Sequence, residues 1–365
     1  MLPSAHRRPG AVPGEGGWAA VLLAIHAGLA LWGAAVNSVT FDENFHVPAG
    51  VVEIRRGDFL ISAVNPPLAK ALLGAAALVA GARLPADSAI ASAEQSVVGE
   101  SFMRRNADRY HRVFLAARLT NVLSTLLGVL VWCFAWRLYG PRGALLALAL
   151  YSFAPESIAH AGLATLEIAA ALGLLASVYA CWVFVRRPGV RAWLRLALAV
   201  SFTFLTRFSA FSVALALPAL AAALARRGRH AGRAWIGLAS LVPATVLSLD
   251  LGYQGKVSFL PLKDHGFYSV PFRALQREWP DLRLPLPDAC MAEAARGHST
   301  TFLFGRIALS RSGTTSRSRS SASGRSVSWP RCWPGRPWGR PRLVRRRAGR
   351  GSSWCSGRRS FCSSP

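Results

Sequence analysis

Long apolar runs, separated by short polar connections, set the pattern of this chain. A membrane-spanning helix needs about 20 predominantly apolar residues, or somewhat fewer where neighbouring helices bury its ends. Seven runs approach that length: Trp18–Val36, Val113–Trp136, Gly143–Ala159, Leu163–Val185, Leu194–Leu205, Phe208–Ala225 and Ala234–Leu251. The fifth is short for a span, and we expect it to form a tight hairpin with the sixth around Thr206 and Arg207. The pattern predicts an all-α integral membrane protein with about seven transmembrane helices.

A shorter apolar stretch, Leu68–Val79, is not counted as a span. It has fewer than about 15 residues, and a span here would invert every later connection. We therefore expect a juxtamembrane helix at the membrane surface, within a long first external loop at residues 37–112. The first run follows Arg7 and Arg8, as a signal peptide would. Because it exceeds the roughly 7–15 apolar residues of a signal core, an uncleaved anchor is favoured.

The arginines predict how the chain is oriented. The connections 137–142, 186–195 and 226–233 are rich in Arg and free of Asp and Glu. The positive-inside rule places them in the cytoplasm. The N-terminal residues 1–17 then lie there too, and the transmembrane core covers 18–251. The loop 37–112, the turn near Glu156 and His160, and the loop 252–310 fall on the external side. We therefore expect a bacterial inner or plasma membrane protein whose carboxylates, and hence its chemistry, face outward.

The composition supports a membrane protein, and the location of the arginines explains the high net charge. The chain is 52% hydrophobic and only 16% charged, with a mean hydropathy of +0.30, which is too apolar for an ordinary soluble domain. The net charge of +26 would suggest nucleic acid, but the last 55 residues hold 14 Arg and no acidic residue. Removing those 14 charges leaves +12, much of it in short loops. The charge therefore reports topology, and no nucleic-acid partner is expected.

The C-terminal segment 311–365 differs in composition from the rest. In it, 40 of 55 residues are Arg, Ser, Gly or Pro, which predicts a disordered basic tail. Taken literally, such a tail is an arm for nucleic acid or anionic lipid. However, shifting the reading frame of 313–321 (GTTSRSRSS) permits Trp-Tyr-Tyr-Phe-Pro-Val-Ala-Phe-Leu, a plausible start of another membrane helix. We hypothesise a frameshift near residue 311, which an intact frame in independent reads of the locus would refute.

Three polar motifs follow the first span: 41–46 (FDENFH), 57–59 (GDF) and 65–70 (NPPLAK). An isolated pair such as Asp42 and Glu43 is ordinarily a solvated part of a loop, although carboxylates beside hydrocarbon are costly unless solvated or used. The ordered series resembles the protein O-mannosyltransferase and aminoarabinose transferase group of membrane glycosyltransferases. These have the C-type (GT-C) fold, whose long first external loop carries an Asp-Glu pair and a His-Pro-Pro-Leu-like motif. Asn65 stands here in place of the usual His.

Later motifs continue the resemblance in order. Residues 159–167 (AHAGLATLE) are similar to the group's A-H-x-x-L-x-T-x-D, with Glu167 in place of Asp. Residues 205–209 (LTRFS) are similar to its L-T-K-x-S, and Arg207 keeps the positive charge. Residues 284–287 and 302–312 resemble its third external loop. The resemblance thus spans roughly residues 18–312.

The resemblance implies transfer of a sugar from a polyprenyl-phosphate carrier to a protein or glycolipid acceptor, with inversion at the anomeric carbon. Asp42 would be the general base. Glu43 would orient the site, or hold the acceptor or a cation. Arg207, with Lys70 as a second candidate, would bind the donor phosphate, where a cation stabilises the leaving group.

Four further residues, Glu167, His160, His46 and Asn65, would support substrate or a metal. A divalent cation is one candidate cofactor, with no ligand set assigned. Glu167 and His160 could instead be ordinary polar residues at helix ends, and Arg207 could only extend its charge to the membrane interface. The chain as a whole could be an inactive truncated homologue. A polytopic transporter is a further alternative, although transport sites usually lie near the membrane midplane.

Overall fold

The computed structural model describes residues 15–63, 65–207, 216–222, 231–257, 259–267, 270–289, 291, 300–303 and 306–309. The predicted tail 311–365 and most of the sixth predicted run lie outside these residues. The helices in the first half are α1 (Glu15–Val36), α2 (Glu43–Arg56), α3 (Pro67–Val79), α4 (Asp87–Ser92), α5 (Gln95–Arg105), η1 (Ala107–Arg109), α6 (Tyr110–Leu119), η2 (Thr120–Val122) and α7 (Leu123–Phe153). They are followed by α8 (Pro155–Ala161), α9 (Glu167–Arg186), α10 (Val190–Thr206), α12 (Ala231–Ala239), α13 (Leu241–Gly252), η4 (Leu262–Asp264) and α14 (Val270–Glu278). A short antiparallel pair, β1 (Thr300–Leu303) and β2 (Arg306–Leu309), departs from the otherwise helical architecture.

Four helical stretches are long and apolar enough to cross a membrane: Gly16–Val36, Ala107–Phe153, Glu167–Arg186 and Ala234–Gly252. On α1 the large apolar side chains of Trp18, Leu31 and Trp32 stay more than half exposed. A helix that is apolar all round is expected where lipid is the solvent. The predicted helical membrane class is thereby confirmed, and the count of seven spans stays a prediction.

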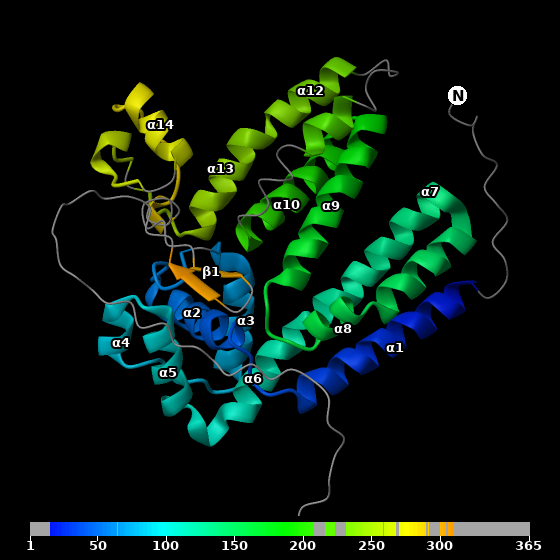
Figure 1. The fold of residues 1–365 in the computed structure, drawn as a ribbon. Coiled ribbons are helices and arrows are strands. Elements are labelled where there is room, and N and C mark those ends of the chain that lie inside the picture. Colours follow the sequence, from blue (N-terminus) through cyan, green and yellow to red (C-terminus); the bar gives the residue numbers. More distant parts are fainter. Residues whose placement is uncertain are drawn as a thin grey trace, which may run out of the picture. The chain divides into compact units, whose positions relative to one another are not determined.

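The longest of these stretches reverses direction within α7. Gly140 has φ 77° and ψ −174°, a backbone conformation open to glycine, and Pro141 starts the next helical arm. The hydroxyl of Tyr151 donates a hydrogen bond to the carbonyl of Ser124, at 2.6 Å. The two arms of α7 therefore lie antiparallel (Figure 1). They correspond to the second and third predicted runs.

Helices α9 and α10 pack along one another, and α13 packs on α10 (Figure 1). A Cβ on Gly173 would lie 2.7 Å from the Thr203 hydroxyl, so glycine permits this close approach. The hydroxyls of Ser177 and Thr203 are 3.0 Å apart across the same interface. Helix α9 begins at Glu167, four residues later than the predicted run, because 163–166 form a turn. The antiparallel pairing brings the start of α9 beside the end of α10.

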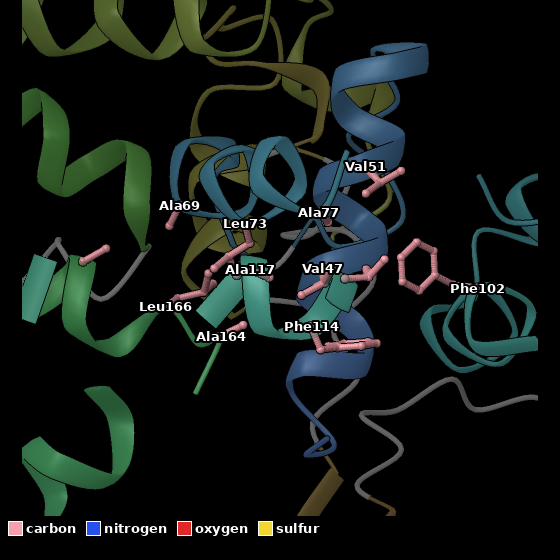
Figure 2. Packing of buried hydrophobic residues seen from close by; sticks show 12 residues of the cluster. Val47, Val51, Ala69, Leu73, Ala77, Phe102, Phe114, Ala117, Ala164 and Leu166 are labelled. Carbon is pink, nitrogen blue, oxygen red and sulfur yellow. The ribbon is translucent and has the colours of Figure 1, made fainter. Parts of the chain in front are cut away.

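Residues 37–112, predicted to be the first external loop, fold into their own helical layer. Helices α2, α3 and α6 share a buried apolar cluster that also takes in Phe102 of α5 and the turn before α9. Figure 2 shows Val47, Leu73, Ala117 and Leu166 gathered between these elements. Burial of such side chains is the main favourable contribution to folding. Helix α3 matches the predicted short helix in its bounds and packs into this layer, and its position at the membrane surface stays a prediction.

Helices α2 and α3 cross in backbone contact. A Cβ added to Gly50 would fall on the carbonyl group of Lys70, and one added to Gly74 would fall on the backbone of Gly50 and Val51. Backbone atoms cannot move aside as the end of a flexible side chain can. Glycine is therefore required at both positions for the two helices to come this close.

We expect Gly74→Ala to lower the free energy of unfolding by about 3 kcal/mol, the upper end of overpacking costs. Thermal unfolding of the purified protein in detergent measures the change. Gly28→Ala is the matched control, because Gly28 also lies in a helix and an added Cβ there meets nothing within 4 Å. Equal midpoints for the two variants would contradict the proposed backbone contact.

Candidate functional site

A buried ion pair between Glu43 and Arg118 lies at the centre of the region that carries the predicted site residues. Their side chains are 0% and 4% exposed. Arg118 Nε donates to Glu43 Oε1 at 2.7 Å, and a terminal nitrogen donates to Oε2 at 2.9 Å. The remaining guanidinium hydrogens go to three backbone carbonyls, of Ala34, Asn37 and Ser38. All five N–H donors of the arginine are therefore used.

Both carboxylate oxygens of Glu43 also accept hydrogen bonds from groups other than Arg118. Beyond Arg118, its Oε1 accepts from the backbone N–H of Ala164 at 2.8 Å, and its Oε2 accepts from the N–H and hydroxyl of Thr40. Burial by itself would raise the pKa of Glu43, but these hydrogen bonds hold it below its usual value. The pair thus fixes the end of α1, the start of α2 and the turn before α9 relative to one another.

A second ion pair forms where α9 begins and α10 ends. Arg207, directly after α10, donates to Glu167 Oε1 at 2.7 Å. His160 Nδ1 lies 4.0 Å from Glu167 Oε2 and 3.5 Å from the Thr165 hydroxyl. The side chains of Glu167, Arg207 and His160 are 31%, 40% and 41% exposed. Three of the predicted residues, separated by up to 47 positions in the sequence, therefore meet at an accessible surface.

A cavity of about 270 Å³ opens between this ion pair and the segment 41–95. Its lining residues are Phe41, Asp42, Phe45, His46, Ser62, Asn65, Gln95, Leu166, Glu167 and Arg207. Five of the eight predicted site residues are among them. Asp42 is exposed at the N-terminal end of α2, and its side chain makes no helix-capping hydrogen bond. The cavity therefore combines an available carboxylate with a paired arginine.

Three predicted site residues do not line this cavity. Glu43 is buried against Arg118, as described above, and His160 Nδ1 lies 4.0 Å from Glu167 Oε2. Lys70 is 1% exposed, forms an ion pair with Glu53, and donates to the carbonyl of Ser62 at 2.8 Å. Because the close crossing of α2 and α3 buries Lys70, it does not reach a phosphate in this structure. Glu43 therefore fits the orienting role that was one of its predicted alternatives, whereas Lys70, predicted to bind the donor phosphate, lies outside the cavity lining.

Burial alters the protonation of two groups on α2. It lowers the pKa of His46, aided by Lys70 and Arg207 and opposed by Asp42 and Glu167, so this imidazole is neutral at pH 7. Burial also raises the pKa of Glu53 to about 7, although Lys70 acts in the opposite direction. Within the part of the chain that the structure describes, no three His, Cys, Asp or Glu side chains are grouped to hold a metal ion. A cation cofactor stays a prediction.

An open apolar groove of about 790 Å³ lies between α9, α10 and α13. Its lining residues are Leu68, Leu172, Ala176, Leu198, Ala199, Ser201, Phe202, Leu205, Ser248, Leu251 and Gly252. Leu205 is two residues before Arg207, and Leu68 is three residues after Asn65. The sequence segments that line the groove and the polar cavity therefore adjoin one another.

Comparison with known proteins gives one match. Residues 110–251 match the family model described as dolichyl-phosphate-mannose-protein mannosyltransferase. No curated protein and no solved structure matches the chain. The match bears out the resemblance over residues 110–251, which hold the motifs at 159–167 and 205–209, and suggests a membrane glycosyltransferase of the C-type (GT-C) fold. The match contains Arg118, His160, Glu167 and Arg207, whereas Asp42 and Glu43 precede it.

Proposed function

We propose, from the family match over residues 110–251, that this chain transfers a sugar from a polyprenyl-phosphate carrier to an acceptor hydroxyl. The observation that carries the proposal is the cavity in which Asp42 meets the Glu167–Arg207 pair. These groups come from the first external loop and from two membrane helices. The cavity therefore offers a base, the Asp42 carboxylate, and a cation, the Arg207 guanidinium, to one small substrate.

Asp42 acts as the general base. Its carboxylate takes the proton of the acceptor hydroxyl as that oxygen forms a bond to the anomeric carbon. The bond between the anomeric carbon and the phosphate oxygen breaks on the opposite face, so the anomeric configuration is inverted. The released polyprenyl phosphate carries away the bonding electrons.

Arg207 receives the donor phosphate. Its guanidinium can bind two phosphate oxygens at once and stabilise the charge that gathers as the bond breaks. Glu167 holds Arg207 in place at 2.7 Å and is itself only partly exposed. The donor phosphate therefore meets an arginine that is already paired with Glu167. It either displaces the Glu167 carboxylate or binds the guanidinium beside it. Glu43 and Lys70 position the surrounding helices.

The apolar groove supports a lipid-borne donor. A polyprenyl chain is confined to the membrane, and an open groove on α9, α10 and α13 lets it enter by lateral diffusion. The acceptor, a protein hydroxyl or a glycolipid, arrives from the water side. The arginine-rich connections at 137–142 and 186–195 support a reaction on the opposite, external face of the membrane, which we propose to be a bacterial inner or plasma membrane.

Transfer in proteoliposomes tests the proposal. We expect label from polyprenyl-phosphate [³H]mannose, and not from a nucleotide-linked mannose, to appear on an acceptor fraction. Arg207→Gln should raise the KM for the lipid donor, and weaken inhibition by bare polyprenyl phosphate, by about 10–100-fold, the value of one or two charge-assisted hydrogen bonds. Arg273→Gln, on α14, is the control. A wild-type chain that transfers from no polyprenyl-linked sugar would overturn the proposed function.

A further inference from the structure

Three buried polar atoms of cavity-lining residues have no hydrogen-bond partner among the described residues. They are the hydroxyl of Ser62, in a residue that is 1% exposed, Nδ1 of His46, and Oε2 of Glu167, which lies 4.0 Å from His160 Nδ1. Buried polar atoms in native proteins are nearly always hydrogen-bonded, so each exception calls for an explanation. Three such atoms around one cavity suggest that a ligand completes their hydrogen bonds, and two of them, on Ser62 and His46, belong to the same segment of the chain as Asn65.

The backbone around Ser62 is fixed although its hydroxyl is not bonded. The Ser62 carbonyl accepts from Lys70 Nζ at 2.8 Å and from the N–H of Asn65 at 3.3 Å. The ion pair of Lys70 with Glu53 holds the donor in turn. Ser62 is therefore placed on the cavity by a rigid support, which is the usual arrangement for a binding residue.

Neutral amides also line the cavity. Asn65 lies on the loop between α2 and α3, and Gln95 is the first residue of α5. With Ser62 and the neutral imidazole of His46, they offer hydrogen-bond donors and acceptors without net charge. The charged groups of the lining are Asp42, at the start of α2, and the pair of Glu167 and Arg207, at the start of α9 and directly after α10. The cavity thus offers a set of neutral hydrogen-bonding groups beside one carboxylate and one ion pair.

The size and the remaining lining fit a single sugar ring. Drug-sized ligands occupy pockets of about 300–1,000 Å³, and this cavity of about 270 Å³ is smaller. The rings of Phe41 and Phe45 meet edge to face at 4.3 Å and supply an apolar surface for the carbon side of a sugar. Sugar hydroxyls both donate and accept hydrogen bonds, as these neutral groups do.

We propose that Ser62, His46, Asn65 and Gln95 form a subsite that hydrogen-bonds the hydroxyl groups of the transferred sugar ring. This inference rests on the proposed function, because it assigns the ring to the polyprenyl-phosphate donor. His46 and Asn65 were predicted site residues from their sequence motifs, whereas Ser62 and Gln95 are assigned from the cavity lining alone.

The test compares binding of two probes, polyprenyl-phosphate mannose and bare polyprenyl phosphate, to the full chain in lipid nanodiscs. We expect Ser62→Ala to weaken binding of the mannosyl lipid by about 5–10-fold, the effect of one hydrogen bond, and to leave binding of the bare carrier unchanged. Ser152→Ala is the matched control, because Ser152 is also fully buried with an unpartnered hydroxyl but lies on α7, away from the cavity. It should change neither affinity.

Folding does not obscure the result, since removing an unbonded buried hydroxyl should not lower the thermal midpoint. Equal affinity of wild type and Ser62→Ala for the mannosyl lipid overturns the subsite, as does equal weakening for both probes. If Ser62→Ala changes only the KM for the acceptor, the subsite is also overturned, because these residues would then bind hydroxyl groups of the acceptor. Binding needs no transfer, so a wild type that shows the predicted affinities without transferring sugar supports the subsite and contradicts the proposed function.

Discussion

Asp42→Asn is expected to lower the rate of sugar transfer by about 10²–10⁴-fold, the usual contribution of a positioned general base. Asparagine keeps the size and shape of the side chain but cannot take the acceptor's proton. Asp42 is exposed and makes no capping hydrogen bond with its side chain, so the fold should be unaffected. The measurement is transfer from polyprenyl-phosphate mannose at saturating donor and acceptor, together with the thermal midpoint.

The control for this change is Asp87→Asn. The Asp87 side chain is 79% exposed, in an ion pair with Arg56, and neither residue lines the cavity. Such a pair contributes little to stability, and its loss should leave the rate within twofold of wild type. Equal transfer by wild type and Asp42→Asn would show that another group accepts the proton.

The gathering of Asp42, Glu167 and Arg207 on one cavity could be anticipated from the sequence. Each lies in a short polar motif at the end of an apolar run, and the alternation of arginine-rich and carboxylate-bearing connections put the motifs on one side of the membrane. Helix ends on the same side of a bundle are close in space. Their assignment to roles still depends on the resemblance and on the experiments above.

Arg118 is the main residue of this region that the sequence analysis did not identify. It lies inside the apolar run Val113–Trp136, and an arginine in such a position rarely occurs without a carboxylate partner. That signal was available, but the partner was not identifiable, because Glu43 is 75 positions away in another helix. The resemblance gave the adjacent carboxylates of the FDENFH motif different roles but did not show which of them is buried. The structure separates them: Glu43 faces the buried arginine, and Asp42 faces the cavity.

Lys70 was misplaced for a different reason. Its motif puts it one turn into α3, where a lysine could extend to an interface. Gly50 and Gly74 instead bring α2 and α3 into backbone contact, and this encloses Lys70 with Glu53. Which face of a short helix is covered depends on its crossing with a neighbour, and periodicity alone does not reveal that crossing.

Arg118→Leu is expected to destabilise the protein by about 3–5 kcal/mol, because it leaves Glu43 as an unpaired buried carboxylate. Three backbone carbonyls, of Ala34, Asn37 and Ser38, lose their donor in the same step. Urea or thermal unfolding in detergent measures the loss. Arg104→Gln is the matched control, since the Arg104–Glu100 pair is exposed on both sides and exposed pairs of this spacing contribute about 0.3–0.5 kcal/mol.

The direction of the acid dependence provides a second measurement on the same pair. Glu43 has a folded-state pKa below its usual value because of its hydrogen bonds to Arg118, Ala164 and Thr40. Its contribution to stability is therefore complete above the unfolded-state pKa of about 4.3 and is lost as the pH falls through the lower folded-state pKa. We expect the midpoint of the wild type to drop in this acid range and that of Glu43→Gln to drop less. If Arg118→Leu unfolds like Arg104→Gln, and acid acts equally on wild type and Glu43→Gln, the pair does not hold Asp42 and the turn before α9 in place, and the arrangement of the cavity must have another cause.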